Sequence, residues 1–334
     1  MDIHSIVVGR DLMACRFEVV FNAGEVENAT ELAVDALDLV EQIESRITVY
    51  RDTSELARLN ATAAEGWQPV APDLFTLLLH ARDLQARTGG AFDCASGSLT
   101  RAWGFLERRG RTPADDALAA ARERSGLGLV EFDKAGRRVR FTRPGVELNL
   151  GAIGKGWAID RALGDLRAAG VESVLVHGGQ SSVRARGVQG PALPGRRGWQ
   201  VGLRHPLRPA QRLATITLDD RALGTSGSGT QFFVDRGRKL GHILDPRSGR
   251  PAEAGVISAT VIAPEAADAD ALSTALYVLG EGGLSCVAAP GGEIGAILAL
   301  PGALPGTVRV VVANLDEETC VLPASAGVEV ERIA

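Results

Sequence analysis

The stretch LNLGAIGKGWAID, residues 148–160, restricts the fold more than any other part of this sequence. An apolar run leads into three glycines that surround one lysine, and helix-forming residues follow. Glycine permits tight turns and close backbone approach, so the stretch predicts a strand that turns into a helix. The free N–H groups at the start of that helix can bind an anion. From this segment alone, a phosphate site and glycines that only pack a strand against a helix are equally good interpretations.

A Walker-type phosphate loop is excluded for this segment. Such a loop needs a glycine, four further residues, and then Gly-Lys followed by Ser or Thr. Here Asn149 stands at the position of the first glycine, and Gly156 follows Gly154 and Lys155. The hydroxyl that would hold magnesium in a Walker loop is therefore missing.

Hydrophobic periodicity predicts the other elements. Strands and helices do not alternate strictly, which favours an α+β fold with mixed or antiparallel sheets flanked by helices over a doubly wound fold. With no internal repeat, we expect a single domain over residues 1–334. Helices are expected over 28–47, 72–88, 113–126, 156–169 and 268–280, and strands over 14–21, 129–150 (as a hairpin), 171–179, 199–203, 213–218 and 255–263.

Composition and charge exclude several classes of protein. A net charge of -5 argues against nucleic-acid binding, which needs a basic surface. The N-terminus shows neither a signal peptide nor a transmembrane span, so a cytoplasmic location is expected. The cysteines lie far apart without metal-binding spacing, which favours free thiols at Cys15, Cys94, Cys286 and Cys320.

Two stretches in the second half carry hydroxyl and imidazole groups. Residues 223–233, LGTSGSGTQFF, form a polar loop that is also compatible with an ordinary turn. Residues 241–251, GHILDPRSGRP, contain His242 and Asp245. A histidine beside an acid can serve as a general base near neutral pH, and a structural Asp-Pro turn is the alternative.

A third stretch, DADALSTALYVLG at residues 268–280, offers oxygen ligands for a metal. Asp270 and Thr274 are four residues apart, so on a helix they share one face. A carboxylate and a hydroxyl on one face suit magnesium. Capping of the helix by Asp268 or Asp270 explains this segment better when it is considered alone.

Together, these stretches resemble the ApbE family, the FAD:protein FMN transferases. The run NLGAIGKGWAID is similar to the family's strand–Gly-Lys-Gly–helix segment, and the resemblance extends from about Met13 to about Leu300. SRITVYRDTSELARLN and TGGAFDCASGSLTRAWGF also fit family motifs. Later matches are the family's TSG loop at Thr225–Gly227, its H-I-x-D-P-x-T-G-x-P motif at His242–Pro251 with Ser248 at the Thr position, and its A-D-A-L-x-T-A-L-x-V-L-G motif at Ala269–Gly280.

The resemblance implies a set of site residues. Magnesium would be bound by the carbonyl of Ala152 and the side chains of Asp270 and Thr274, with a weak oxygen from Ser273. FAD, the substrate, would contact Met13, Tyr50, Trp103, Gly104, Phe105, Asn149, Lys155, His242, Leu244 and Asp245.

The implied reaction transfers FMN from FAD to a Thr or Ser hydroxyl in the flavinylation motif of an acceptor flavoprotein, and AMP leaves. Lys155 and magnesium would offset charge on the phosphate, and His242 would take or position the hydroxyl proton. Two alternatives remain open at this point: a magnesium-dependent FAD pyrophosphatase that forms FMN and AMP, and a non-catalytic FAD-binding protein.

Four positions depart from the family pattern. Asn149 replaces the usual Asp, and Gln180 follows HGG where Asp or Asn is common. Ser228 and Gly229 replace Asp-Tyr, and Gly241 stands where a polar residue is often found. These changes bear on FAD affinity and acceptor recognition more than on the fold.

Overall fold

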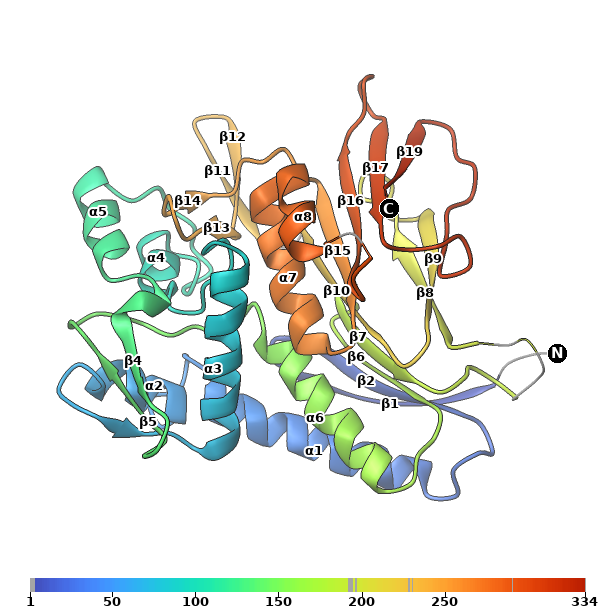
Figure 1. The fold of residues 1–334 in the computed structure, drawn as a ribbon, viewed down its shortest axis with the longest axis horizontal. Coiled ribbons are helices and arrows are strands. Elements are labelled where there is room, and N and C mark those ends of the chain that lie inside the picture. The colour runs from blue at the N-terminus through green and yellow to red at the C-terminus, as the bar shows by residue number, and fades with distance from the viewer. Residues whose placement is uncertain are drawn as a thin grey trace.

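A nine-stranded mixed sheet forms the centre of the molecule (Figure 1). The computed structural model describes residues 4–191, 195, 197–227, 229, 231–289 and 291–333. Neighbouring strands are antiparallel except β17 and β19, which run parallel, so the predicted α+β fold with mixed sheets is confirmed. In spatial order the strands are β1 (Ser5–Leu12), β2 (Cys15–Asn22), β6 (Val174–Gly178), β7 (Ser182–Arg186), β10 (Ala222–Gly227), β15 (Ser258–Ala263), β16 (Gly295–Pro301), β17 (Val308–Ala313) and β19 (Val328–Ile333).

Helices and small sheets surround this centre. The helices are α1 (Ala29–Ile47), α2 (Glu55–Thr62), α3 (Pro72–Arg87), α4 (Gly97–Ala102), α5 (Asp115–Glu123), α6 (Gly154–Ala168), α7 (Ala266–Leu279) and α8 (Leu284–Val287), with 3-10 turns at Leu127–Leu129 and Gly280–Gly283. The small sheets consist of β3 (Gln68–Pro69), β5 (Arg138–Phe141) and β4 (Val130–Asp133); of β18 (Cys320–Val321), β9 (Arg212–Leu218) and β8 (Trp199–Arg204); of β11 (Phe232–Asp235) and β12 (Arg238–Gly241); and of β13 (Leu244–Asp245) and β14 (Arg250–Pro251).

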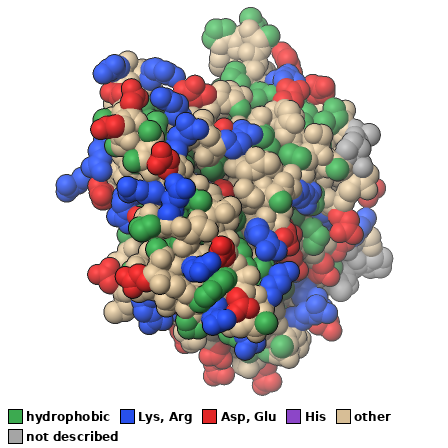
Figure 2. All heavy atoms as spheres, turned by 60° about the vertical axis from the view of Figure 1, so that its left-hand side comes forward, with side chains coloured by type: hydrophobic (Ala, Val, Ile, Leu, Met, Phe, Trp, Pro, Cys, Tyr) green, Lys and Arg blue, Asp and Glu red, His purple; other side chains and the backbone are tan. Residues whose placement is uncertain are grey.

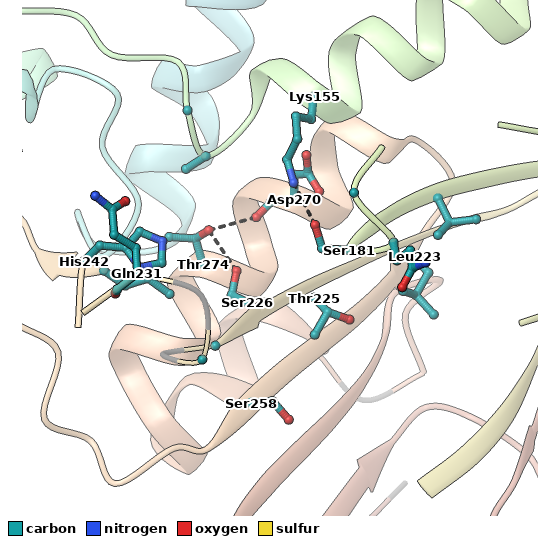
Figure 3. A pocket seen from close by; sticks show the side chains of 18 of the residues that line it. Lys155, Ser181, Leu223, Thr225, Ser226, Gln231, His242, Ser258, Asp270 and Thr274 are labelled. Carbon is teal, nitrogen blue, oxygen red and sulfur yellow. Dashed lines mark hydrogen bonds between the residues drawn. The ribbon is translucent and has the colours of Figure 1, made fainter. Parts of the chain in front are cut away.

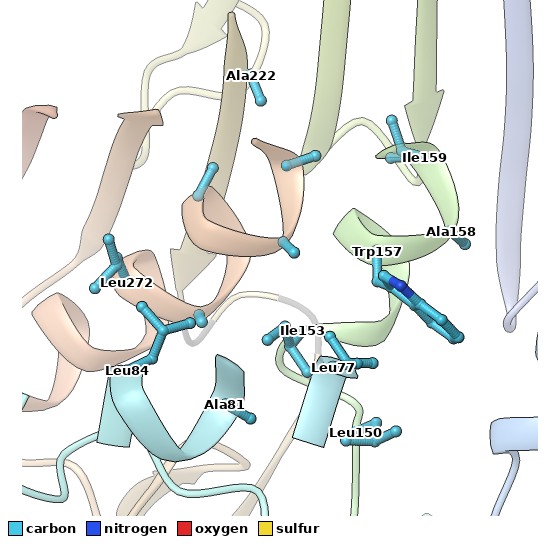
Figure 4. Close-up of a cluster of buried hydrophobic side chains, with 14 of the residues drawn as sticks. Leu77, Ala81, Leu84, Leu150, Ile153, Trp157, Ala158, Ile159, Ala222 and Leu272 are labelled. Carbon is cyan, nitrogen blue, oxygen red and sulfur yellow. The ribbon is translucent and has the colours of Figure 1, made fainter. Parts of the chain in front are cut away.

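Both faces of the central sheet are covered, and the side chains alternate between two cores. Val174 and Val176 of β6 pack in the core that contains α1, α3, α6 and α7, part of which Figure 4 shows. Leu175 lies in the other core, with residues of β8 and β9. Leu298 and Ile297 of β16 divide in the same way. Because side chains of a strand alternate between faces, these strands are apolar at nearly every position.

Helices α6 and α7 interlock at their beginnings. The backbone N–H groups of Ala266 and Ala267 donate to the carboxylate of Asp160 at 2.8 and 2.9 Å. In return, the N–H of Gly156 donates to Asp270 Oδ2 at 2.8 Å. Each helix therefore supplies an acidic side chain to the positive N-terminus of the other. The helix expected from residue 268 thus begins at Ala266, and Asp270 caps α6 rather than its own helix.

Gly156 is required at this crossing, and its replacement is the first prediction. A Cβ at Gly156 would lie 2.1 Å from the backbone oxygen of Ala266, which cannot move aside without shifting α7. We expect Gly156→Ala to lower the free energy of unfolding by about 3 kcal/mol. Gly164 lies on the same helix with no neighbouring atom within 4 Å. Gly164→Ala should therefore raise stability by about 0.5–1 kcal/mol. Urea unfolding checks both values, and equal midpoints for the two variants would contradict the close crossing.

The strand expected immediately before α6 is not formed. Within residues 129–150, the hairpin consists of β4 and β5 only. The N–H of Leu148 donates to Asn60 Oδ1 at 2.8 Å, and its carbonyl accepts from Asn60 Nδ2 at 2.9 Å. The N–H of Asn149 donates to the carbonyl of Cys94 at 2.7 Å. The side-chain amide of Asn60, on α2, therefore makes the hydrogen bonds that a neighbouring strand would make.

The surface carries charges of both signs. Figure 2 shows Lys and Arg side chains beside Asp and Glu side chains on one face of the molecule. In the part of the chain that the structure describes, no helix is both long and apolar enough to cross a membrane. All four cysteines are free thiols, as expected.

Candidate active site

A cavity of about 1140 Å³ brings together segments that are far apart in the sequence (Figure 3). Its walls come from the start of α6, from α7, from the turn 179–181 between β6 and β7, and from β10. Strand β8, Lys239 of β12 and residues of the segment 91–106 also line it. The glycine-rich loop singled out in the sequence therefore faces a cavity large enough for a small-molecule ligand.

Many of the residues implied by the resemblance line this one cavity. Met13, Trp103, Gly104, Asp245 and Ser273 are not among the lining residues. Those that line it are Tyr50, Phe105, Asn149, Ala152, Lys155, His242, Leu244, Asp270 and Thr274.

Trp103 and Gly104 position the neighbouring Phe105, which lines the cavity. The Nε1–H of Trp103 donates to the carbonyl of Gly249 at 2.7 Å, and the ring is buried. Gly104 has a φ of 70°, in the left-handed region that favours glycine. The turn at Gly104 directs the neighbouring Phe105 to the cavity wall.

Asp245 and Met13 lie in turns. The Asp245 carboxylate accepts the N–H of Arg247 at 3.0 Å and forms an ion pair with its guanidinium at 2.9 Å. This geometry is that of the structural Asp-Pro turn. Met13 and Ala14, with φ of 50° and 60°, form the turn between β1 and β2.

Asp270 presents a buried carboxylate to the cavity. The residue is 8% exposed, and burial raises the pKa of its carboxyl, an effect that the charge of Lys155 opposes. Oδ2 accepts the N–H of Gly156. Among the residues that the structure describes, no basic side chain forms an ion pair with Asp270. A buried carboxylate without an ion-pair partner is a fit site for a cation.

Three hydroxyls surround the next turn of α7. The Oγ of Ser226 on β10 lies 3.1 Å from Thr274 Oγ1 and 2.9 Å from Ser273 Oγ. Thr274 and Ser273 both donate to the carbonyl of Asp270, at 3.1 and 3.0 Å. Thr274 lines the cavity, whereas Ser273 is 1% exposed and lies behind it.

Lys155 reaches across the cavity from the first turn of α6. Its Nζ donates to Ser181 Oγ at 2.7 Å (Figure 3). Asn149 shapes the loop that precedes α6, because its Oδ1 accepts the N–H of Gly151 at 2.9 Å. This turn is one that an Asp or an Asn can form, so the amide preserves the backbone while it removes a negative charge.

The imidazole of His242 is held in its neutral form. Its Nδ1 lies 3.0 Å from the carbonyl of Gln231, which can only accept a hydrogen bond. Nδ1 therefore carries the proton, and the lone pair is on Nε2. Burial lowers the pKa of His242 below its ordinary 6.5. The ring of Phe105 packs edge-on against it, with centroids 6.4 Å apart.

Sequence reasoning did not identify every polar group of the cavity. Ser181, Ser226 and Gln231 line it, although none of them was assigned a role. Ser226 belongs to the TSG loop, and Ser181 directly follows HGG and Gln180, so the signal was present in the sequence. Gly229 also lines the cavity, whereas Ser228 lies outside the described residues.

A cationic side chain, a buried carboxylate, hydroxyls and a neutral imidazole around one cavity are the groups that phosphoryl-transfer sites use. Residues 13–298 match the sequence model of the ApbE family. This match covers most of the sequence, and the chain therefore belongs to the ApbE family.

Individual relatives agree with this assignment. A FAD:protein FMN transferase of Treponema pallidum is 35% identical over 77% of this chain and 73% of its own length. Another, from Rhodobacter capsulatus, is 38% identical over 68% of this chain and 42% of its own length. The crystal structure of the apo flavinyl transferase ApbE of Pseudomonas stutzeri superposes with a TM-score of 0.82 and 27% identity, covering 98% of this chain and 100% of that one.

Proposed function

We propose that this protein is a magnesium-dependent FAD:protein FMN transferase. It moves the FMN part of FAD onto a Thr or Ser hydroxyl in the flavinylation motif of an acceptor protein and releases AMP. The observation that carries the proposal is the convergence of Lys155, His242, Asp270 and Thr274 on one cavity. Membership of the ApbE family and relatives named as such transferases support it.

In the proposed reaction, the acceptor hydroxyl attacks the FMN-side phosphorus of FAD. The bond from that phosphorus to the bridging oxygen breaks, and AMP leaves with the electron pair. His242 Nε2 takes the hydroxyl proton, because its tautomer and lowered pKa leave that nitrogen free to accept. The ammonium of Lys155 stabilises the charge that develops on the phosphate oxygens.

Magnesium fits the donor set of this site. The buried Asp270 carboxylate, the Thr274 hydroxyl and the Ala152 carbonyl are hard oxygen ligands on one cavity. Bound there, the ion would supply Lewis-acid stabilisation of the pyrophosphate. Ser273 fits this donor set less well than Thr274, since it is buried and its hydroxyl donates to the backbone carbonyl of Asp270 behind the cavity wall.

The test measures AMP release and covalent flavin with FAD, with and without magnesium, and with and without a candidate acceptor domain. Transfer is expected to give AMP together with flavin that stays on the acceptor in denaturant. AMP without covalent flavin would identify a pyrophosphatase. FAD binding without AMP under any condition would identify a flavin-binding protein.

The rate of transfer should depend on pH through the protonation of His242. Protonation of His242 removes the proposed base, so kcat/KM should fall as pH decreases through its pKa. Because burial lowers that pKa, the acid limb should lie below pH 6.5. We expect His242→Gln to lower kcat by about 10²–10³ and to abolish the acid limb.

His80 provides the matched control for this measurement. It lies on α3, pairs with Asp268 at 2.5 Å, and is not among the cavity-lining residues. His80→Gln should leave both the rate and the acid limb unchanged. If His242→Gln retained near-normal turnover, His242 would not be the base.

A further inference from the structure

Strand β8 turns its edge, not a face, toward the cavity. The consecutive residues from Gln200 to Arg204 all line it. Side chains of a strand alternate between the two faces of a sheet, so a run of consecutive lining residues means that the edge is exposed to the cavity. The strand order β18-β9-β8 agrees, because β8 is the outer strand of its sheet.

The backbone groups of β8 that point to this edge follow from the register. The N–H of Thr217 on β9 donates to the carbonyl of Thr319 at 2.9 Å, so Thr217 faces away from β8. Thr215, two residues earlier, faces the same way. Their partners on β8 are Gln200 and Gly202. In an antiparallel pair such residues direct their N–H and C=O groups away from the neighbouring strand, here toward the cavity.

By the residues that the structure describes, only the beginning of this edge is covered. The N–H of Gln200 donates to Gln189 Oε1 at 3.2 Å, and the carbonyl of Gly198 accepts the N–H of Gln189 at 3.0 Å. Farther along, no group of the described segments bonds to the outward N–H and C=O of Gly202. The open edge at Gly202 is thus a template for one more strand.

The outer strands of the central sheet differ from β8 in position. No residue of β1 or β19, the outer strands of the central sheet, is among the cavity-lining residues that the structure describes. The exposed β19 also carries Glu329, Glu331 and Arg332, charges of the kind that protect an edge from pairing. Strand β8 has no charged residue before Arg204.

The far end of β8 is linked to the proposed chemistry. The guanidinium of Arg204 donates to the side-chain oxygen of Gln180. The next residue, Ser181, accepts the hydrogen bond from Lys155 Nζ. Arg204 forms no ion pair with any acidic residue in the described ranges, so its charge is available to a partner.

We propose that β8 binds the acceptor protein by pairing with an extended segment of it that carries the Thr or Ser and an acidic residue for Arg204. Strand addition of this kind supplies affinity through main-chain hydrogen bonds. The segment would run along Gly202 toward Arg204 and bring its hydroxyl to the side of the cavity that holds Lys155. This inference rests on the proposed function, because it names how the acceptor of that reaction is recognised.

The experiment compares Gly202→Pro with Gly202→Ala. Proline removes the outward N–H but leaves the hydrogen bonds between β8 and β9, to which Gly202 does not contribute. Alanine keeps the N–H, and its Cβ would meet only the flexible side chain of Arg212, at 3.1 Å. The probes are short fluorescein-labelled peptides with one central Thr and an Asp at varied positions, and binding is read by anisotropy with FAD and magnesium present.

The wild type and Gly202→Ala are expected to bind a subset of the peptides, and Gly202→Pro to bind that subset about tenfold more weakly or worse. Arg204→Gln should remove the preference for Asp within the subset. The two Gly202 variants should bind FAD as the wild type does, which shows that the fold is intact. Equal peptide binding by the two Gly202 variants, or no binding by the wild type, would overturn the proposal. Peptide binding without AMP release or covalent flavin would instead contradict the proposed transferase activity alone.

Discussion

Asp270→Asn is expected to reduce magnesium-dependent AMP release and flavin transfer by about 10³-fold or more, the loss of several kcal/mol of transition-state stabilisation. Asn has nearly the shape of Asp, and its oxygen can still accept the N–H of Gly156 at the start of α6. The variant therefore removes a negative charge and leaves the crossing of α6 and α7 in place.

Asp270→Asn is expected to lower activity but to raise thermal stability. Burial raises the pKa of Asp270, so the ionised carboxylate costs stability at neutral pH when no cation is bound. Asp270→Asn removes that cost and should raise Tm in the absence of magnesium. Magnesium should raise the Tm of the wild type and leave that of the variant unchanged. Thermal unfolding with and without the ion checks both statements.

Asp268→Asn is the matched control on the same helix. Asp268 pairs with His80 and does not line the large cavity. Its replacement should change the rate of transfer by less than about twofold relative to the wild type, because a partly exposed ion pair outside the cavity contributes little. If Asp270→Asn kept more than a tenth of the activity, or if the control lost as much, Asp270 would not be a ligand of an essential cation.

The parts of the fold that the sequence predicts well are those whose signals are local. Helix α7 is rich in Ala and Leu and α1 has a clear apolar stripe, so both were expected close to where they lie. The prediction of a strand before α6 was wrong. Residues 146–150, VELNL, alternate between apolar and polar side chains as a strand does, but the backbone of Leu148 bonds to Asn60 and that of Asn149 to Cys94. A pattern shows which residues are buried, but it does not show which groups satisfy their backbone.

The same distinction holds for the site: residues in local motifs were identified from the sequence, but contacts between distant segments were not. The family resemblance directed attention to residues such as Lys155 and Asp270, which the fold brings to one cavity from two helices. The contact between Lys155 and Ser181 joins residues 26 positions apart, and the cap between Asp270 and Gly156 spans 114. No spacing rule predicts such contacts. The sequence also did not predict the open edge of β8. The groups that point to this edge depend on how β9 pairs with β18 on its other side.

Lys155→Met tests whether the lysine acts in the transition state or only in binding. Met has a similar length and no charge, so the variant removes the ammonium that faces Ser181. We expect kcat to fall by about 10²–10³, because an ammonium aimed at the phosphate stabilises the charge that develops during transfer more than the charge of bound FAD. The affinity for FAD should weaken much less. Single-turnover transfer at saturating FAD separates the two effects.

Ser181→Ala separates the charge of Lys155 from its position. The variant keeps the ammonium but removes the hydroxyl that accepts its hydrogen bond at 2.7 Å. A loss of about 5–20-fold in kcat is expected, since one charge-assisted hydrogen bond is worth roughly 1–2 kcal/mol. A Lys155→Met enzyme with weakened FAD binding but normal kcat would show that the lysine binds FAD and its transition state equally. The electrostatic part of the mechanism would then belong to the proposed cation site at Asp270 alone.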